Sequence, residues 1–249
     1  MKRSKILIAA FIILILWQVL AMIVDLPMAP TTIEILSAFY DGLINGDLFT
    51  HFLWSLFRVL ASTFFAILIA APLGMILGQS RKLDSFFSPA IYMLYPIPKV
   101  VFVPVVLLFF GIGNFPKILI IFIILFFQIL VLVRDYAAGL SPELIYSVKS
   151  LGAGRRGLFW YVYLKGSLPA VLTALRQSIG TAVAVLYVAE LFATREGLGY
   201  YIFMNGSNLF DYPAMFAGIV ALSIMGVALY FTTEDLEKWL TPWINRNKS

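Results

Sequence analysis

Residues 141–156, SPELIYSVKSLGAGRR, form a polar, glycine-punctuated segment between two long apolar runs. Pro142 can open a helix, since the first helical position needs no backbone N–H, and Glu143 in the first turn complements the helix dipole. Gly152 is expected to end this helix, because glycine tolerates left-handed backbone geometry. An apolar stripe at helical spacing is predicted along one face of it, formed by Leu144, Ile145, Val148 and Leu151.

A second amphipathic piece follows the glycine turn. It starts at Arg155 and Arg156, and Pro169 is expected to mark the return of the chain to the membrane. Its predicted apolar side holds Leu158, Phe159, Val162 and Tyr163. The spacing therefore predicts a helix–glycine turn–helix over about 141–169. Two interpretations remain open: an amphipathic hairpin resting on lipid headgroups, or a surface that docks another protein.

The composition of the chain is that of a membrane protein. The 249 residues are 61% hydrophobic and 12% charged, whereas soluble domains are closer to half apolar and a quarter charged. The chain has no Cys and one His, so disulfides and metal sites with Cys or paired His ligands are excluded. The net charge of +5 is not arranged as a nucleic-acid surface, because the cations lie beside apolar runs.

Six apolar stretches approach the roughly 20 residues that a membrane-spanning helix needs. They predict an all-α polytopic membrane protein with spans at Ile6–Val24, Leu53–Leu77, Phe86–Phe110, Lys117–Val133, Ala170–Phe192 and Ala214–Thr232. Pro96 and Pro98 interrupt the third span, which we therefore expect to be broken or re-entrant. The first span also fits a signal peptide, but it is too long for a typical one and no small-x-small cleavage site follows it, so we expect it to be retained.

The distribution of Lys and Arg over the connections predicts the orientation. Both termini are expected to be cytoplasmic, since the alternate connections on that side carry most of the cations. These cations are Lys2, Arg3, Lys5, Arg81, Lys82, Arg134, Lys149, Arg155, Arg156, Lys165, Lys238, Arg246 and Lys248.

The first outer connection predicts a short amphipathic helix over about 31–45. Thr31 and Glu34 have the spacing of a capping box, and Gly46 suits the position just beyond the helix end. This helix is interpreted as lying on lipid, with a docking ledge for an extracellular binding protein as the alternative. His51 follows it and is interpreted as an interface residue.

Ionisable groups within the spans mark a candidate translocation path, because a charge at bilayer depth is costly and usually faces a partner or water. Lys99 follows the break at Pro96 and Pro98, and broken helices often line substrate sites in transporters. Arg176 lies inside the fifth span and Glu190 near its outer end. The alternative for each charged residue, and for Arg58 in the second span, is snorkelling to the nearest interface. For Lys99 the alternative is a structural or interfacial role.

Motifs spread over about residues 30–245 together resemble the permease subunits of ABC importers, closest to those for sulfonates, taurine, nitrate and thiamine or riboflavin precursors. The resembling segments are Ser55–Leu60, Tyr95–Pro98 with Val103-Pro104 and Phe110–Gly113, Leu175-Arg176, and Ala189-Glu190 with Gly197–Tyr200. The 141–169 loop resembles the EAA loop that docks on the ATP-hydrolysing subunit, aligned on Gly152. Tyr146-Ser147-Val148 then stand at the Glu-Ala-Ala positions, so the acid is lost. The resemblance implies that docking uses Pro142, Glu143, Tyr146, Ser147, Leu151, Gly152 and Ala153.

The resemblance further implies a type I ABC importer permease fold, with one permease domain over 1–249, in a bacterial inner membrane. Implied partners are a second permease copy, by default identical, two ATP-binding subunits and an extracytoplasmic substrate-binding protein. We expect no cofactor on this chain, with ATP and Mg²⁺ on the partner, because the sequence contains no Gly-x-x-x-x-Gly-Lys-Ser/Thr phosphate loop. The chain is therefore not expected to be an enzyme.

The expected substrate is a small organic or inorganic anion, such as a sulfonate, taurine or nitrate, or a vitamin precursor. The alternative function is a stand-alone secondary transporter or channel, which would require inverted repeats and buried acids that couple ions. An intramembrane protease is disfavoured, since His51 is the only His and lies at a predicted span boundary.

Overall fold

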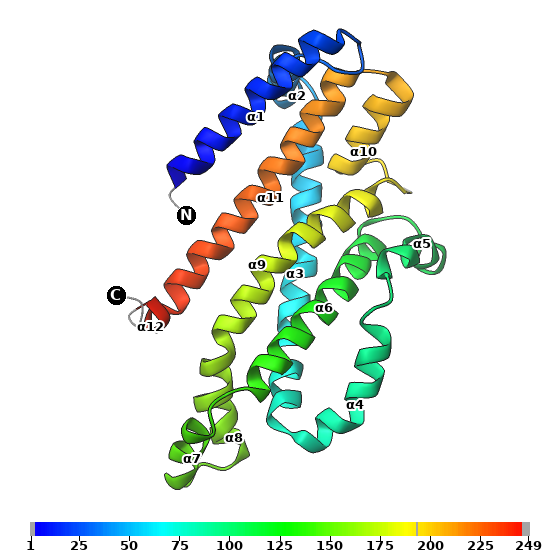
Figure 1. Cartoon of the computed structure of the whole chain (residues 1–249). Coiled ribbons are helices and arrows are strands. Elements are labelled where there is room, and N and C mark those ends of the chain that lie inside the picture. The colour runs from blue at the N-terminus through cyan, green and yellow to red at the C-terminus, as the bar shows by residue number, and fades with distance from the viewer. Residues whose placement is uncertain (1–2, 193, 246–249) are drawn as a thin grey trace. The chain divides into compact units, whose positions relative to one another are not determined.

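The computed structural model describes residues 3–192 and 194–245, and over these residues it contains helices and turns without a strand (Figure 1). The predicted cations Lys2, Arg246 and Lys248 lie outside the described residues. The helices are α1 (Arg3–Val24), α2 (Thr32–Ile44), α3 (Leu48–Gln79), α4 (Arg81–Leu94), η1 (Lys99–Phe102), α5 (Val103–Phe110), α6 (Asn114–Ala138), α7 (Pro142–Ser150), α8 (Arg155–Leu158), η2 (Phe159–Tyr163), α9 (Leu164–Glu190), α10 (Leu198–Phe203), η3 (Met204–Leu209), α11 (Tyr212–Leu240) and α12 (Pro242–Asn245).

Four helices in the described residues are long and apolar enough to cross a membrane. They are α3, α6, the continuous helix Arg155–Glu190 made by α8, η2 and α9, and α11. A fifth candidate is the pair Arg81–Leu94 and Lys99–Phe110, which bends by 75° at the Pro96–Pro98 segment, so the predicted break is confirmed. The apolar part of α1, Ile8–Val24, is shorter than these spans. The count of six spans and the cytoplasmic termini stay predictions.

The chain packs as two compact units. Unit 1 comprises Met1–Ser55 and Glu190–Met225, and unit 2 comprises Leu56–Ala189 and Gly226–Ser249. The division falls within α3 and α11 and at the end of α9. The single permease domain expected from the sequence stays a prediction.

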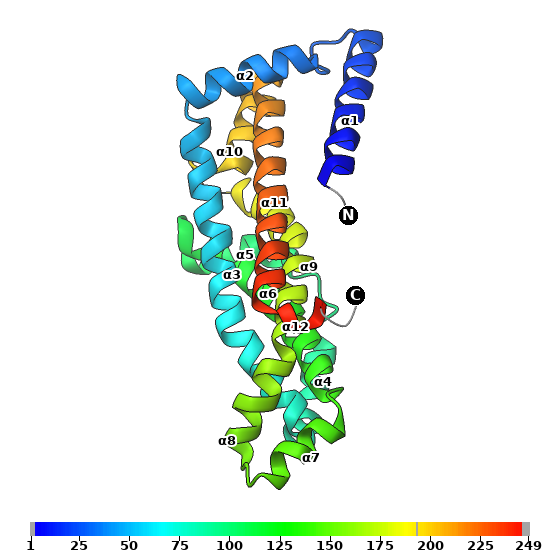
Figure 2. The ribbon, with the colours of Figure 1, turned by 90° about the vertical axis from the view of Figure 1, so that its left-hand side faces the viewer.

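In unit 1, α1 and α2 meet at a sharp corner that polar contacts hold (Figures 1 and 2). Trp17 Nε1 donates to Pro30 O at 3.0 Å, and Gln18 Oε1 accepts the Thr32 N–H at 2.8 Å. The capping box is confirmed, since the Thr31 side chain accepts the Glu34 N–H while the Glu34 carboxylate accepts the Thr31 N–H at 2.7 Å. These contacts fix where α2 begins and the direction in which it leaves α1.

In unit 2, two glycines let α3 lie directly against α6. A Cβ on Gly78 would lie 2.6 Å from Ala137 Cβ and 2.7 Å from Arg134 O, and one on Gly74 would lie 2.9 Å from Leu130 O. These glycines therefore serve close helix packing.

Two residues of unit 2 lie in surroundings that the sequence did not predict. Pro169 lies inside α9, because the helix runs without interruption from Arg155 to Glu190, and its place at the return to the membrane stays a prediction. Proline is tolerated there, since neighbouring helices can satisfy the freed carbonyl. Arg58 does not snorkel: its side chain is buried, and Arg58 Nε donates to Asn114 Oδ1 at 2.8 Å.

Candidate functional site

The loop over 141–156 folds into α7, a glycine turn and α8, as predicted. Ser141 precedes α7 and its hydroxyl accepts the Leu144 N–H at 3.4 Å, while Pro142 occupies the first turn. Gly152 has φ +84° and its N–H bonds to Lys149 O at 3.0 Å. A Cβ on Gly152 would meet no atom within 4 Å. Glycine is therefore favoured here by backbone conformation and not by packing.

The apolar side chains of α7 divide between two directions. Ile145 and Val148 pack against a buried cluster formed by Ala137, Leu158, Val162 and Tyr163. Leu144 is 54% exposed and Leu151 is 84% exposed. The single stripe predicted for these residues is therefore wrong, because Leu151 belongs to the turn beyond the helix end and Leu144 lies about 100° around α7 from Ile145. The buried half holds α7 in place, and the exposed half is left on the surface.

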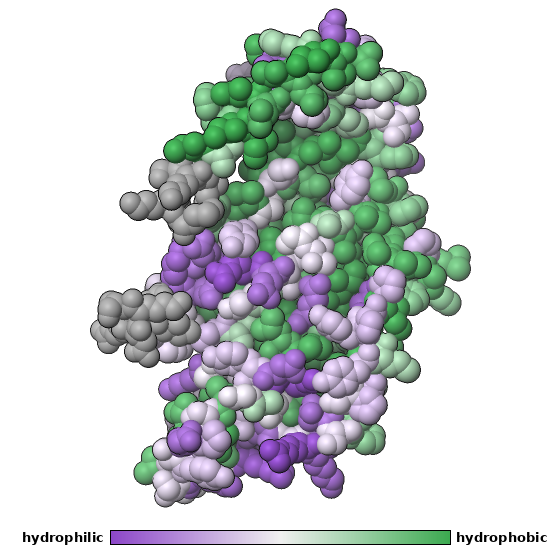
Figure 3. Space-filling view, in the orientation of Figure 1, coloured by the Kyte–Doolittle hydropathy of each residue, from purple (hydrophilic) through white to green (hydrophobic). Residues whose placement is uncertain are grey.

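The docking residues expected from the sequence lie together on this surface. We call it the coupling surface; six of its members are exposed and Ala153 is half-buried. Its members are Pro142, Glu143, Tyr146, Ser147, Leu151, Gly152 and Ala153. In Figure 3 hydrophilic side chains gather over the end of unit 2 that carries α7 and α8. Leu151 and Tyr146 are exposed near the exposed polar residues Glu143, Ser147 and Lys149 of α7. Exposed large side chains with polar residues around them are typical of protein–protein contacts.

The electrostatics of α7 follow its helix ends. The Glu143 carboxylate bonds to its own backbone N–H and to the Ser141 hydroxyl, and these hydrogen bonds hold the pKa of Glu143 below its ordinary value. Glu143 is therefore ionised at neutral pH. Lys149 lies in the last turn of α7, where a cation interacts favourably with the helix dipole.

A groove of about 250 Å³ runs beside the coupling surface, where α3 meets α8 and η2. It is lined by Ile76, Gln79, Arg155, Arg156, Phe159 and Trp160. Gln79 Nε2 donates to Arg155 O at 3.3 Å, and Trp160 is 60% exposed. Sequence analysis missed the groove, because Gln79 and Arg155 are 76 positions apart in the chain.

Lys99, expected beside the translocation path, caps the broken helix. Its ammonium donates to Leu94 O at 3.0 Å, Tyr95 O at 2.9 Å and Ile97 O at 3.3 Å, and it lies 4.6 Å from the centre of the Phe127 ring. Pro96 and Pro98 occupy the turn that Lys99 closes. These are carbonyls released where α4 ends, so the contacts favour the structural interpretation that the sequence left open. A role of Pro96, Pro98 and Lys99 in the path stays a prediction.

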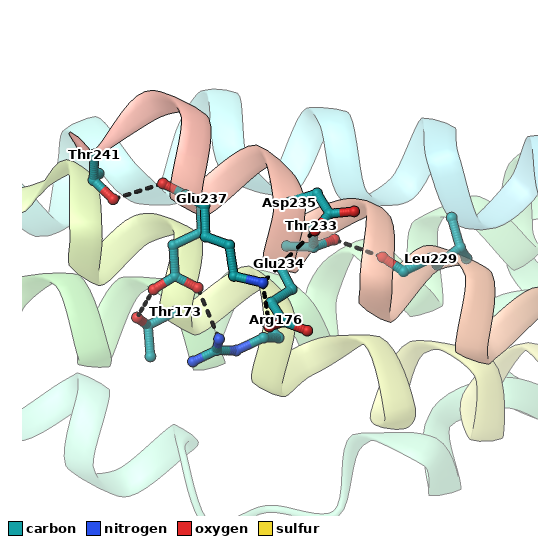
Figure 4. Close-up of polar contacts among 9 residues, drawn as sticks. Thr173, Arg176, Leu229, Thr233, Glu234, Asp235, Glu237 and Thr241 are labelled. Atoms are coloured by element: carbon teal, nitrogen blue, oxygen red, sulfur yellow. Dashed lines mark hydrogen bonds and ion pairs between the residues drawn. The ribbon is translucent and has the colours of Figure 1, made fainter. Parts of the chain in front are cut away.

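Arg176 forms an ion pair with a neighbouring helix. Arg176 Nη1 lies 3.0 Å from Glu237 Oε2, and Thr173 Oγ1 donates to Glu237 Oε1 at 3.1 Å, so two residues of α9 hold one carboxylate of α11 (Figure 4). Both members of the pair are partly buried. The contact links α9 to the end of α11 inside unit 2, and a role of Arg176 in the path stays a prediction.

Glu190 is fully buried and anchors a turn of the chain in unit 1. Its carboxylate accepts hydrogen bonds from the Ser55 hydroxyl at 2.8 and 2.9 Å and from the Gly199 N–H at 2.9 Å. Ser55 Oγ in turn accepts the Leu198 N–H at 2.8 Å. These contacts explain why Glu190 is followed a few residues later by the Gly-Leu-Gly segment at 197–199. They give Glu190 a structural role. Its role in the path stays a prediction.

Sequence analysis missed two residues of this anchor. His51, interpreted as an interface residue, is instead buried, and His51 Nδ1 accepts the Gly197 N–H at 3.0 Å. The sequence indicates Ser55 only as part of the Ser55–Leu60 segment. Three successive N–H groups, of Gly197, Leu198 and Gly199, therefore bind His51, Ser55 and Glu190. His51 and Ser55 are four residues apart and therefore lie on one face of α3. This spacing is the feature of the sequence that could have predicted that they act together.

The chain matches known transport proteins over most of its length. Residues 70–246 match the profile of the family described as "Binding-protein-dependent transport system inner membrane component". The "Taurine transport system permease protein TauC" of Escherichia coli (strain K12) is 32% identical over 82% of this chain and 74% of that protein. The "Putative aliphatic sulfonates transport permease protein SsuC" of Bacillus subtilis (strain 168) is 27% identical over 93% of this chain and 85% of that protein.

The fold has a solved counterpart. A chain of the MetNI methionine ABC transporter, in an inward-facing conformation, superposes with a TM-score of 0.68 at 20% identity, over 78% of this chain and 96% of that chain. The described chain therefore has the fold of a type I ABC importer permease.

The chain belongs to the family of inner-membrane components of binding-protein-dependent transport systems. It is a multi-pass inner-membrane protein and a permease subunit of an ABC importer, a transport component rather than a catalytic subunit.

Proposed function

We propose that this chain forms half of a substrate pathway that works by alternating access. The complete importer then contains a second permease copy, by default identical, two ATP-binding subunits and an extracytoplasmic substrate-binding protein. ATP and Mg²⁺ bind to the ATP-binding subunits. This assembly is supported by the family of the chain, whose description names a dependence on a binding protein.

The observation that carries the proposal is the coupling surface. Leu151, at the tip of the α7–α8 turn, is 84% exposed although it is a large apolar residue. A partner that covers Leu151 and Tyr146 removes apolar area from water, which stabilises the complex by about 25 cal/mol per Å² buried. Charged groups around the patch would fix the orientation of the partner.

The packing behind this surface supplies a route for force. Ile145 and Val148 hold α7 on the cluster that contains Ala137 of α6 and Leu158 at the start of the long helix. A displacement of α7 is therefore transmitted to α6 and α9, because a close-packed cluster resists deformation. In the proposed cycle, ATP binding closes the ATP-binding subunits, their movement pulls the coupling surface, and the helices rock to open the path outward. Hydrolysis reverses the change.

The substrate proposed is a small organic or inorganic anion, such as a sulfonate, taurine or nitrate, or a vitamin precursor. Relatives support this range, since their names refer to taurine, aliphatic sulfonates and formylaminopyrimidine. The alternative function is a secondary transporter or channel that works without a partner ATPase.

The proposal is tested by co-purifying the chain with candidate ATP-binding subunits and measuring their ATPase activity in lipid nanodiscs. Leu151→Asp is expected to abolish the complex and the stimulated ATPase activity while leaving the membrane protein folded. Leu151→Met keeps an apolar side chain at the same place and is expected to behave as wild type. A wild-type chain that binds no such subunit and moves solute alone would establish the alternative function.

A further inference from the structure

We propose that a polar cavity between α6 and α9 forms part of the substrate path, and that it suits a small solute of zero net charge held by hydrogen bonds. This inference rests on the proposed function, because it assigns a place to the pathway proposed there. It narrows the substrate range given there to solutes of zero net charge and so argues against inorganic anions such as nitrate. It differs from the sequence-based expectation that the substrate is a small anion.

The cavity lies within unit 2 and has a volume of about 350 Å³. Gln128 and Asp135 of α6 line it, seven residues or two helical turns apart and hence on one face. Gln177 and Ser178 line it from α9, and Tyr95 lines it from the end of α4. Helices from distant parts of the sequence thus turn their polar residues toward one space.

These polar residues stand out from their surroundings. Gln128 is the one polar residue in the otherwise apolar run from Ile118 to Val133. Its side-chain oxygen is buried and has no hydrogen-bond partner among the residues that the structure describes. A buried amide oxygen is costly inside a membrane unless water or a solute pairs with it. The cavity beside Gln128 offers room for such a partner.

Among the described residues, the cations at and near the cavity are paired, whereas the single Arg134 guanidinium is shared by the carboxylates of Asp84 and Asp135, and the Asp135 side chain is 59% exposed. The Asp135 carboxylate is paired with Arg134, whose Nη2 and Nε lie 2.8 and 2.9 Å from Asp135 Oδ1. Neither Lys nor Arg is among the described residues that line the cavity. Outside it, the Lys99 ammonium is bound to three backbone carbonyls and Arg176 is paired with Glu237.

The remaining polar groups of the lining are neutral donors and acceptors, and they lie beside the apolar side chains of Val131, Leu132 and Ala174. The amides of Gln128 and Gln177 can each donate and accept, while the Ser178 hydroxyl already donates to Ala174 O at 2.7 Å and so offers acceptor capacity. A zwitterion can place its cationic group near the Asp135 carboxylate and its acidic group on the amides. An inorganic anion would find no uncompensated cation here, so the lining favours zwitterionic or uncharged solutes over nitrate-like ones.

The absence of Cys from the chain allows a direct test with single-cysteine variants. Gln128→Cys and Gln177→Cys are treated with membrane-impermeant thiosulfonate reagents, one cationic and one anionic, in nanodiscs that contain the chain and its ATP-binding subunits. Ile129→Cys and Ile179→Cys are matched controls, since both positions are buried on the same helices. Thiols react as thiolates, which form where water reaches them.

The cysteines at 128 and 177 are expected to react at least about tenfold faster than the controls, with the cationic reagent as fast as the anionic one or faster. Reaction as slow as that of the controls would overturn the cavity's place in the path. An anionic reagent that reacts tenfold faster would overturn the assigned solute class. Gln177 is exposed, so its variant keeps the test open if Gln128→Cys fails to fold.

Trapping with ATP and vanadate separates this inference from the proposed function. A change in the reaction rates on trapping supports both. Fast reaction that ATP and vanadate leave unchanged supports a water-filled cavity at this place while it contradicts ATP-driven alternating access.

Discussion

Two glycine turns with positive φ have opposite chemistry. At Gly197 (φ +117°) the turn is buried, and its three N–H groups bind His51, Ser55 and Glu190. At Gly152 (φ +84°) the turn is exposed, and the neighbouring Leu151 projects an apolar side chain into the surroundings. The first turn places polar groups inside the protein, and the second places an apolar group outside it.

The difference indicates whether each turn is stabilised by contacts within the protein or is left for a partner to cover. The 197–199 turn is satisfied by its own unit, so changes in it are expected to act on stability. The coupling surface leaves apolar area uncovered, so changes in it are expected to act on binding of a partner while the fold persists. Variants at matched positions separate the two effects.

The largest effect is expected for Glu190→Ala. This change leaves the buried Ser55 hydroxyl and Gly199 N–H without an acceptor, and each unpaired buried donor costs about 1–3 kcal/mol. We expect a loss of about 2–5 kcal/mol in the free energy of unfolding, measured by thermal or denaturant unfolding in nanodiscs. Glu143→Ala, which removes an exposed acid in the first turn of α7, is the control and should unfold as wild type. Equal stability of the two variants would show that the 197–199 anchor is dispensable.

Two neighbouring residues of α7 test the same difference within one helix. Ile145→Asp places a charge against the buried cluster and is expected to reduce stability by about 2 kcal/mol or more. Leu144→Asp lies on the exposed side and should change stability by less than about 0.5 kcal/mol. We expect it to weaken partner-stimulated ATPase activity instead. Unfolding and ATPase measurements on both variants check this, and loss of stability in Leu144→Asp would refute the division of α7 into two faces.

A smaller effect is expected for Gly152→Ala. A Cβ would meet no neighbour, so the cost is that of left-handed backbone alone, about 1–2 kcal/mol confined to the turn. ATPase coupling should fall severalfold, because the position of Leu151 depends on this turn. Gly154→Ala is the matched control, since Gly154 has φ −76° and equally open surroundings. Identical behaviour of the two variants would show that the conformation of Gly152 is unimportant.

The smallest effect concerns the exposed capping box of α2. Hydrogen bonds from the Thr31 backbone and side chain hold the pKa of Glu34 below its ordinary value of 4.5. A lowered pKa means that the stabilisation is present above the ordinary value and is lost as the pH falls through the folded-state value. Amide exchange at the start of α2, corrected for the intrinsic rate, should therefore increase at low pH. Glu34→Gln should lack this pH dependence, and a wild type without it would contradict the capping role.

Several features followed from the sequence because they depend on local properties. The 118–133 run is apolar enough to predict a span without knowing its neighbours, and two prolines two residues apart predict a break wherever they lie. Thr31 and Glu34 predict their own hydrogen bonds, since the partners are three residues apart. The position of Gly152 after a helical pattern likewise predicts a left-handed turn.

Other expectations failed because sequence spacing does not name the partner of a side chain. Leu144 and Ile145 are both apolar and adjacent, and only the packing of α6 and η2 decided which of them is covered. Lys99 fitted a substrate site by its place after the break, and its role in the path stays a prediction; only the structure shows that the carbonyls of the same break hold its ammonium.

By itself the sequence determined a polytopic helical membrane protein, the place of its broken span, and a glycine turn flanked by amphipathic helices, because hydropathy and backbone preference act over a few residues. Only the tertiary structure decided that Glu190 holds Ser55, which is 135 positions away, that Arg176 pairs with Glu237, and that Gln128 and Gln177 share a cavity. These contacts arise from helix packing. It brings together side chains that are far apart in the sequence, and their separation in the sequence does not predict that they are in contact.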